Sequence, residues 1–465
     1  MKKYYAVLLA GSILLTACSD TIPPYEAPAV SGVSTIEPVG DVLSGQSYAG
    51  EEAVAEEVLE SFSSEDGKCR IEKKQSYYEV YLDYTDGDFY KTGKAYAETL
   101  GKAGVDFGEV LEPYLYENIK MAFPNLNGDY HPVEDRIGEL FPGIPEEYRQ
   151  ELEGFAESLS GGKRGMESDG FLSYEEAILM HMVPDCLRGT NCNAFSVWGE
   201  KSVGGDRIVS RTLEWSLGSE NQMCTAHAVT HFIMGEGKNS YTTFSVLGML
   251  DMLTGLNDKG VFAGILDAGS GDDYICEGKK CYTFDLRLAL ETMDTARSVG
   301  EYMVGESKNF TFSHNVIITD RNDSFVAEDC VNLQDEEASK STLRDQYTPL
   351  TDDIRWDNPD SLCVVNAFVT EGSDDHFTAA ANNYVRFCKY NAWAGEKEKL
   401  SLADVKDLVT RERTDRSAGF QKLYSENVFH IIVFDHSTGE LEVCFTGTEG
   451  VKDHPIFVKI ENTLQ

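Results

Sequence analysis

The chain has few positive charges and no long hydrophobic run beyond its first residues. Lysine and arginine number 40 against 79 aspartates and glutamates, so the formal net charge is −39 at pH 7. A protein of this charge repels phosphate backbones and anionic lipid head groups, and nucleic acid is not expected as a partner. No glycine-rich loop follows an expected strand and opens an expected helix, so no nucleotide cofactor is expected either.

The first eighteen residues have the pattern of a bacterial lipoprotein signal. Lys2 and Lys3 precede an apolar run from Tyr4 to Leu15, and Leu-Thr-Ala-Cys ends at Cys18. The run is too short to span a bilayer. We expect cleavage before Cys18 and attachment of lipid to its thiol. The lipid alone would then hold the protein on the exported side of a membrane, in the periplasm or on the cell surface. The alternative is a cytosolic protein whose first strand is apolar.

Composition divides the rest of the chain into three parts. Residues 19–66 are acidic, with several prolines and few aromatics, which predicts a mostly disordered tether. Residues 67–191 are expected to be rich in helix and residues 192–465 rich in strand. Strands and helices that occur in blocks, without regular alternation, favour a layered α+β fold over a doubly wound parallel sheet.

Apolar periodicity and turn residues predict the individual elements. We expect helices over 89–119, from Pro145 to about Ser160, from a capping box at Ser173 and Glu176 to Met182, over 285–303, and from about Ser401. The expected strands are 77–83, 193–200, 207–213, 226–234, 241–248, 261–267, 312–319, 324–328, 428–434 and 440–445.

Cys192 is the residue that most directly suggests a function. It opens a strand-like segment that turns at Gly204 and Gly205 and returns through Arg211 and Glu214. A thiol with a guanidinium and a carboxylate on the returning strand has the parts needed for covalent catalysis. A tight turn centred on the two glycines would place Leu217 opposite Cys192, with Arg211 on the face of the thiol and Glu214 on the other face.

The chain contains eleven cysteines, many for a reduced compartment and compatible with an envelope protein. Cys276 and Cys281 are the easiest local pair to imagine as a disulfide. A structural bridge between Cys186 and Cys192 is the main alternative to a catalytic Cys192.

Several segments, in order along the chain, resemble the isopenicillin N acyltransferase-like branch of the N-terminal nucleophile hydrolases, relatives of choloylglycine hydrolases and acid ceramidases. The likeness covers roughly residues 75–450. It implies a four-layer αββα sandwich without a metal or other cofactor, in a precursor that cuts itself between Asn191 and Cys192. The products would be an alpha subunit (67–191) and a beta subunit (192–465) in one heterodimer. The segments that carry it are Glu151–Ala156, Cys192 with Phe195, Gly205, Arg211–Trp215, Leu253–Val261, Phe284–Glu291 and the hairpin from Val428 to Cys444.

In such an enzyme the nucleophile carries its own base. A free α-amine has a pKa of about 7.7 to 8.0, so the amine of Cys192 can take the proton of its own thiol. The thiolate would attack an amide carbonyl, form a thioester and pass the acyl group to water or to another amine. Before cleavage the amine is part of the peptide bond to Asn191, so the uncut chain should be nearly inactive.

The resemblance also implies roles for residues near the nucleophile. Arg211 matches the arginine that favours the thiolate by its charge, and Glu214 stands where the family usually has an aspartate. Ordinary salt bridging between strands is the alternative for this pair.

Later in the chain, Asn366 matches the asparagine that stabilises the oxyanion, with a second donor near Asp267 that would be a backbone amide. Arg386 matches part of a late arginine motif, while Asn383 stands where a first arginine is often found. The alternatives are a turn-capping role for Asn366 and a surface ion pair for Arg386.

Three other functions are weighed against a self-processing amidase. A papain-like thiol peptidase would pair Cys192 with a distant histidine such as His314, His430 or His436. A non-catalytic envelope lipoprotein could use the same fold as a binding module. A zinc site at His227 and His231 is not expected, because the segment reads as a strand and has no adjacent glutamate.

The expected substrate is a small molecule with a linear amide, and hydrolysis is favoured over acyl transfer because an envelope enzyme meets abundant water. N-acyl amino acids, conjugated bile acids, penicillin-like amides, β-alanyl or γ-glutamyl amides and peptides all fit a thiol amidase.

Overall fold

The computed structural model describes residues 47–187, 191–268, 275–330, 340–352, 354–373, 381–412 and 421–461. The predicted lipoprotein signal and Cys18 lie outside these residues. In the described ranges, none of the helices combines the length and the apolar character that a membrane span requires.

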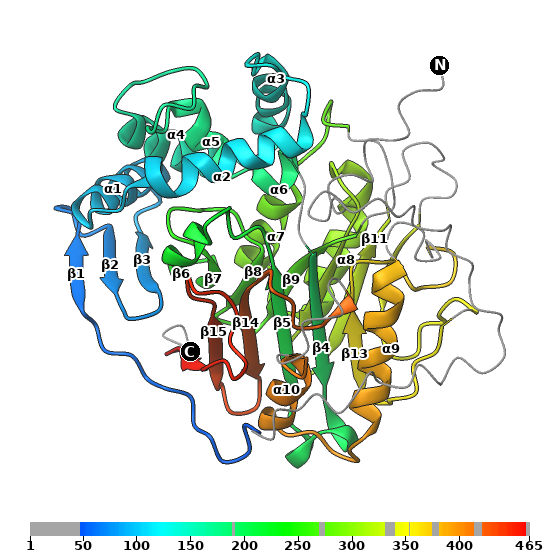
Figure 1. The fold of residues 1–465 in the computed structure, drawn as a ribbon. Coiled ribbons are helices and arrows are strands. Elements are labelled where there is room, and N and C mark those ends of the chain that lie inside the picture. The colour runs from blue at the N-terminus through cyan, green and yellow to red at the C-terminus, as the bar shows by residue number, and fades with distance from the viewer. Residues whose placement is uncertain are drawn as a thin grey trace, which may run out of the picture.

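Two β-sheets form the centre of the molecule (Figure 1). The larger contains, in spatial order, β1 (Glu60–Ser63), β2 (Cys69–Lys73), β3 (Tyr78–Tyr84), β6 (His227–Met234), β7 (Tyr241–Val246), β8 (Thr254–Asn257), β9 (Phe262–Asp267), β10 (His314–Thr319), β11 (Ser324–Asp329) and β12 (Ser341–Arg344). The smaller contains β13 (Ser361–Val364), β4 (Asn191–Val197), β5 (Ile208–Glu214), β14 (Val428–Asp435), β15 (Leu441–Phe445) and β16 (Val458–Lys459).

Helices cover the outer faces of both sheets. On the smaller sheet, α9 (Ala381–Gly395) packs against β13, and α10 (Leu402–Val409) packs against β5 and β14. On the larger sheet, α7 (Tyr282–Thr292) packs against β8 and α8 (Ala296–Glu306) against β10 to β12. The inner faces meet where β4 packs against β9. The predicted layered α+β fold, with two sheets between helices, is confirmed.

The remaining helices gather at one end of the sandwich, in the upper part of Figure 1. They are α1 (Phe89–Lys102), α2 (Phe107–Ala122), α3 (His131–Leu140), α4 (Glu146–Ser160), α5 (Tyr174–Met180) and α6 (Val183–Cys186). Glycines let α1 and α4 cross closely, because a Cβ at Gly93 would lie 2.0 Å from the carbonyl oxygen of Glu151. Glu151 itself is buried and pairs with the buried Arg287 of α7.

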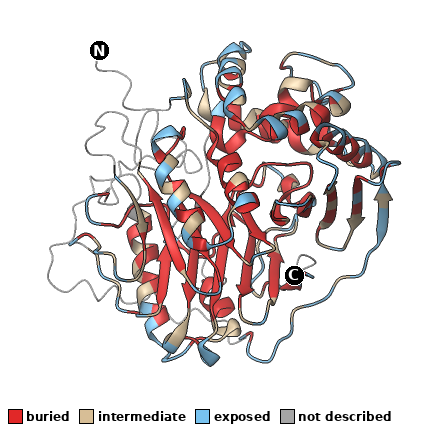
Figure 2. Ribbon diagram, turned by 180° about the vertical axis from the view of Figure 1, so that it is seen from behind, coloured by how far each residue is buried: buried red, intermediate tan, exposed pale blue. Residues whose placement is uncertain are grey.

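Burial on both faces explains why the central strands lack a polar–apolar alternation. Every residue of β5 and of β14 is buried, because one face meets the other sheet and the opposite face meets α10 (Figure 2). Polar side chains on these strands, such as Arg211, His430 and Glu214, therefore lie inside the protein. Buried charge of this kind needs partners close at hand.

Two of the predicted helices are each divided in two. The helix expected over 285–303 stops at Thr292, and Thr295 caps a second helix through a reciprocal bond with Ser298. The helical region expected over 89–119 is broken at Gly104, whose φ of 71° is left-handed, and Asp106 caps the next helix. Local caps and a glycine stop the helices where the apolar spacing continues across the gap.

The predicted tether of residues 19–66 is wrong for its last twenty residues. Tyr48 is buried against Phe457, and Val54 forms a parallel bridge with Val458. The chain then runs from beside α10 to the edge of the larger sheet, where β1 pairs with β2 (Figure 1). Backbone pairing and a few aromatic contacts hold this polar segment, and its composition carries little sign of either.

Asp185, in α6, predicts a pH dependence of stability. Burial raises the pKa of this carboxyl to about 7, although it accepts a hydrogen bond of 2.6 Å from the Thr283 hydroxyl. The unfolded chain therefore releases this proton near pH 4 and the folded chain near pH 7, so the free energy of unfolding should fall as the pH rises between them. Asp185→Asn should remove up to about 4 kcal/mol of that fall. Denaturant unfolding of both proteins at pH 4 and pH 7.5 measures this change in the free energy of unfolding. The same fall in Asp185→Asn as in the unsubstituted protein would contradict the assignment.

Candidate active site

Cys192 is the second residue of β4, and its side chain is fully buried between the sheets. It pairs with Leu213 of β5, so the expected pairing with Leu217 is wrong. The reason is the connection between the strands, where two short 3-10 turns, Gly199–Lys201 and Val203–Gly205, replace a two-residue turn. The register is displaced by an even number of residues, so each side chain keeps the face predicted for it.

Arg211 lies on the same face as the thiol. Its Nη2 is 3.3 Å from Cys192 Sγ and donates a second hydrogen bond of 2.7 Å to the carbonyl oxygen of Ile265 on β9. Burial raises the pKa of the Cys192 thiol, and the charge of Arg211 acts against that rise. In this structure the thiol therefore keeps its proton, and a cation is in place to favour the thiolate once a base is present.

A glycine on the facing sheet makes room for this arginine. A Cβ at Gly264 of β9 would lie 2.9 Å from Arg211 Cγ and 3.3 Å from its Nε. Any side chain in place of Gly264 would push the guanidinium of Arg211 away from Cys192 Sγ.

Gly264→Ala should therefore lower activity without changing any residue that contacts the thiol. We expect a loss of roughly tenfold or more in kcat/KM, because a shift of the guanidinium by a fraction of an ångström weakens a charge interaction in a buried site. The measurement is the rate of the amide hydrolysis that the sequence resemblance implies, with Gly101→Ala as the matched control because nothing lies within 4 Å of a Cβ there. Equal losses in the two variants would contradict this role of Gly264.

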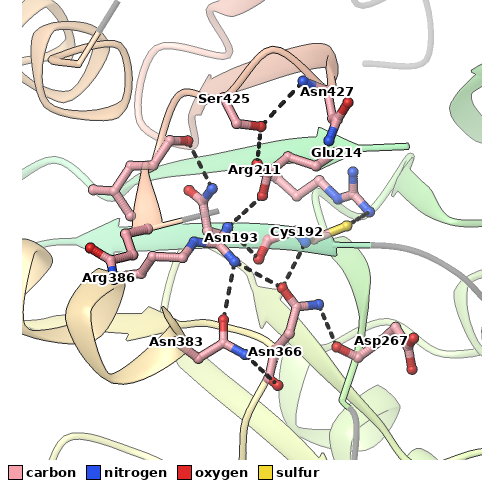
Figure 3. Close-up of polar contacts among 12 residues, drawn as sticks. Cys192, Asn193, Arg211, Glu214, Asp267, Asn366, Asn383, Arg386, Ser425 and Asn427 are labelled. Atoms are coloured by element: carbon pink, nitrogen blue, oxygen red, sulfur yellow. Dashed lines mark hydrogen bonds and ion pairs between the residues drawn. The ribbon is translucent and has the colours of Figure 1, made fainter. Parts of the chain in front are cut away.

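The backbone of Cys192 is held at both of its polar groups (Figure 3). Its N–H donates to Asn366 Oδ1 at 2.8 Å, and its carbonyl oxygen accepts a hydrogen bond of 3.0 Å from Arg386 Nη2. Asn366 Nδ2 donates in turn to the carbonyl oxygen of Asp267. The nitrogen that would become an α-amine after cleavage thus lies against a fixed acceptor.

Arg386 joins several of the predicted site residues in one buried cluster. It lies on α9, is 2 % exposed, and forms an ion pair with Glu214 on the face of β5 opposite to the thiol. Its Nη1 donates to the side-chain oxygens of Asn366 and Asn383, each at 3.1 Å. The alternative of a surface ion pair for Arg386 is wrong.

Asn383 lies one helical turn before Arg386 on α9. Besides accepting from Arg386, it donates to the carbonyl oxygen of Asn366 at 2.9 Å. An arginine at this position would bring a second positive charge beside Arg386, whereas the amide both accepts and donates. The departure from the pattern of the family that the sequence resembles is therefore accommodated within the cluster.

At Asp267 the group that contacts Asn366 is the backbone carbonyl, and the oxyanion role of a backbone amide there stays a prediction. A carbonyl accepts hydrogen bonds and cannot stabilise an oxyanion. In this structure the side chain of Asn366 is engaged with Asp267 and with the backbone N–H of Cys192.

Three polar residues of the site were missed in the sequence. The Ser425 hydroxyl donates to Glu214 Oε1, and the Tyr390 hydroxyl donates to the side chain of Asn193. Asn193 follows Cys192 in a strand that is otherwise largely apolar, and this polar residue was a usable signal. Ser425 lies in a loop before β14, and its place beside Glu214 depends on the tertiary fold alone.

The three histidines considered for a papain-like pairing have other neighbours. His314 Nε2 is 3.1 Å from Asp329, and His436 Nε2 is 2.8 Å from the Thr319 hydroxyl. His430 of β14 pairs with Leu213 of β5, which pairs in turn with Cys192 of β4. His430 therefore lies two strands, about 10 Å, from Cys192. Among the described residues, the side chain within hydrogen-bond distance of Cys192 Sγ is Arg211.

His227 and His231 bind different groups. His227 Nε2 is 2.8 Å from the carbonyl oxygen of Thr446, and His231 is 2.8 Å from the Thr242 hydroxyl. The part of the chain that the structure describes contains no group of three or more metal-ligating side chains arranged to hold an ion.

The cysteines that suggested disulfides are free thiols. Cys276 and Cys281 are not joined, nor are Cys186 and Cys192. The sulfur of Cys192 is therefore not held in a disulfide and is available for covalent chemistry.

Comparisons with known proteins give a loose structural likeness. Similar solved structures include an N-acylethanolamine-hydrolyzing acid amidase ortholog from Caenorhabditis elegans, with 13% identity over 52% of this chain and 92% of that one, at a TM-score of 0.36. A variant of conjugated bile acid hydrolase from Clostridium perfringens has 12% identity over 59% and 98%, at 0.35. Penicillin V acylase from Agrobacterium tumefaciens has 12% identity over 58% and 86%, at 0.32. No family model and no curated protein matches.

Proposed function

We propose that the protein is a cysteine amidase that activates itself by cutting the bond between Asn191 and Cys192. The observation that carries the proposal is the pair of contacts at Cys192. Its Sγ lies 3.3 Å from Arg211 Nη2, and its backbone nitrogen lies 2.8 Å from Asn366 Oδ1. One contact suits a thiolate and the other suits an α-amine, so both halves of an N-terminal nucleophile have a partner.

The first reaction in this proposal is the self-cleavage. The thiol of Cys192 attacks the carbonyl carbon of Asn191, and the backbone nitrogen of Cys192 leaves as an amine while a thioester forms. Water then hydrolyses the thioester, which leaves a carboxylate on Asn191 and restores the thiol. Arg211 stabilises the thiolate form during the attack, and Asn366 Oδ1 accepts a hydrogen bond from the departing amine.

The second reaction uses the new amine as the base. It takes the thiol proton, the thiolate attacks the amide carbonyl of the substrate, and the amine returns the proton to the leaving nitrogen. Water releases the acyl group from Cys192. Arg386, held by Glu214, fixes the carbonyl of Cys192 and thereby the direction of its amine. Arg211 and Arg386 thus act from opposite faces of β4.

The two chains produced by the cut would remain together. β3, from the first part, pairs in parallel with β6, from the second part, over seven residue pairs from Tyr78 with Ala228 to Tyr84 with Met234. The bridge between Val54 and Val458 adds a second link. A heterodimer in one continuous sheet is therefore the expected product.

The substrate class is a small molecule with a linear amide, and water is the expected acceptor of the acyl group. A lipid anchor at Cys18 and a location on the exported side of a membrane belong to the same proposal. An acyl transfer to another amine would use the same thioester and differ only in the last step.

The test is to trap the thioester. The protein is mixed with a panel of N-acyl amides and quenched in acid, and the chain that contains residue 192 is weighed. We expect a gain equal to the acyl group, abolished in Cys192→Ala and retained in Cys444→Ala, which removes a buried thiol of β15. Ligand binding without any acyl adduct or hydrolysis would replace the proposal by that of a binding module.

A further inference from the structure

Asn315, on β10 of the larger sheet, is fully buried and bonds to the segment that carries Asn366. Its Nδ2 donates to the carbonyl oxygen of Val365 at 3.0 Å and to that of Ala367 at 2.9 Å. Asn366 lies between these two residues, and its Oδ1 accepts the hydrogen bond from the backbone N–H of Cys192. One side chain of the larger sheet therefore holds the main chain on both sides of Asn366.

The carbonyl group of Asn366 has a donor of its own. Asn383 Nδ2, on α9, donates to it at 2.9 Å. Three successive carbonyl groups are thus bound by side-chain amides, two of them by Asn315 and one by Asn383. With its main chain fixed in this way, Asn366 directs its side chain at the backbone nitrogen of Cys192.

Two charged residues of the larger sheet hold the same segment at its two ends. Glu328 on β11 and Arg344 on β12 are both buried and form an ion pair of 2.7 Å. Arg344 Nη2 donates to the carbonyl oxygen of Cys363 at 2.8 Å. Glu328 Oε2 accepts hydrogen bonds of 3.1 and 3.0 Å from the backbone N–H groups of Val369 and Thr370. The ends of the segment are therefore anchored to the larger sheet by buried charge, and its middle by a neutral amide.

The position of Asn315 suits a side chain with two donors and no charge. A side-chain amide has two N–H groups on one nitrogen, whereas an aspartic acid has at most one donor and a leucine has none. Asn315 Oδ1 is buried and has no hydrogen-bond partner in the described part of the chain, which costs free energy. The two bonds from Nδ2 are therefore what this amide contributes.

We propose that Asn315 is a positioning residue for both reactions at Cys192, an inference that rests on the proposed function. It acts through Asn366, whose Oδ1 lies 2.8 Å from the nitrogen that leaves during self-cleavage and then serves as the base. A displacement of about 1 Å in such a group can lower a rate by roughly 100-fold. Because Asn315 bonds to the main chain beside Asn366, its loss should lower kcat and leave KM nearly unchanged.

The first test reads the position of Asn366 without any enzyme activity. It uses the full-length Cys192→Ala protein, in which the backbone N–H of residue 192 keeps Asn366 Oδ1 as its acceptor. Hydrogen exchange at this N–H is followed by mass spectrometry at single-residue resolution. Adding Asn315→Leu should speed the exchange by about tenfold or more, because the segment that carries the acceptor is no longer held.

Asn257→Leu is the matched control for the exchange measurement. Asn257, on β8, is also buried, and its Nδ2 donates to two main-chain carbonyl oxygens at 2.9 and 3.0 Å. The same substitution there removes the same pair of bonds without touching the segment around Asn366, so exchange at residue 192 should stay slow. Asn315→Asp loses at least one of the two bonds and should also speed the exchange, which keeps the test valid if the leucine variant does not fold.

The second test measures self-cleavage and amide hydrolysis in the protein with Cys192 intact. Asn315→Leu should lower both rates by roughly 10- to 100-fold, in kcat rather than in KM. Asn315→Asp should add a pH dependence, because a neutral carboxyl donates one hydrogen bond while the ionised form donates none and repels both carbonyl oxygens. Its rate relative to the unsubstituted protein should therefore fall as the pH rises from 5 to 8, which a loss of packing alone would not cause.

Two results would overturn the proposal. One is exchange at residue 192 that is accelerated equally by Asn315→Leu and by Asn257→Leu. The other is an unchanged kcat in Asn315→Leu together with a relative rate of Asn315→Asp that does not vary with pH. An unsubstituted protein that is neither cut nor active contradicts the proposed function instead, and the exchange measurement then still decides whether Asn315 positions Asn366.

Discussion

Arg211→Met is expected to lower kcat/KM for amide hydrolysis by roughly 100- to 1,000-fold. The guanidinium lies 3.3 Å from Cys192 Sγ in a fully buried site, where burial alone raises the pKa of the thiol. Without the cation that pKa rises further, so a smaller fraction of the enzyme holds the thiolate at neutral pH. The pH profile of kcat/KM should therefore move to higher pH, which a loss of packing alone would not cause.

Arg207→Met is the matched control for this variant. Arg207 immediately precedes β5 at its other end, and its side chain donates to Ser324 and to the carbonyl oxygen of Asn322. The same substitution there removes a largely buried guanidinium without touching Cys192. A drop in rate with an unmoved pH profile in Arg211→Met, or equal losses in both variants, would contradict the role of Arg211 in favouring the thiolate.

Arg386→Met is expected to destabilise the protein by about 3–5 kcal/mol and to stop self-cleavage. The substitution leaves Glu214 buried without its cation and removes the hydrogen bond to the carbonyl oxygen of Cys192. Glu214→Met should cost a similar amount, because it leaves Arg386 unpaired. Denaturant unfolding measures the stability, and the fraction of cut chain measures the processing.

The double variant Arg386→Met with Glu214→Met separates stability from function. Replacing both members of a buried ion pair by apolar side chains is often neutral, so the double variant should recover most of the lost stability. Processing should remain absent, because nothing then holds the carbonyl of Cys192. Recovery of cleavage together with stability would show that the pair serves the fold alone.

The faces of the site residues could be predicted from the sequence, and their pairing partners could not. Side chains alternate along a strand, so the relation of Arg211 and Glu214 to Cys192 survives any even displacement of the register. The displacement itself is set by the 3-10 turns between β4 and β5. Their geometry depends on contacts from residues far along the chain, such as the hydrogen bond from the Val203 amide to the carbonyl oxygen of Leu400.

Residues that approach Cys192 from distant parts of the chain were harder to place. Arg386 had no local sign of burial, and its position follows from the packing of α9 on β13. Ser425 and Tyr390 reach the site only through such contacts. The resemblance supplied Asn366 as a candidate, but its bond to the backbone nitrogen of Cys192 came from the fold. In residues 47–66 the error was of another kind. The composition of this polar segment predicts disorder, but backbone pairing with other strands orders it.

The central claim is that Cys192 becomes an N-terminal nucleophile, and the most direct test is the N-terminal sequence and intact mass of the purified protein. The protein and a Cys192→Ala control are incubated at neutral and at acidic pH to allow slow processing. We predict two chains, the second beginning at Cys192 and absent from the control. One uncut chain under every condition would contradict the self-cleaving mechanism.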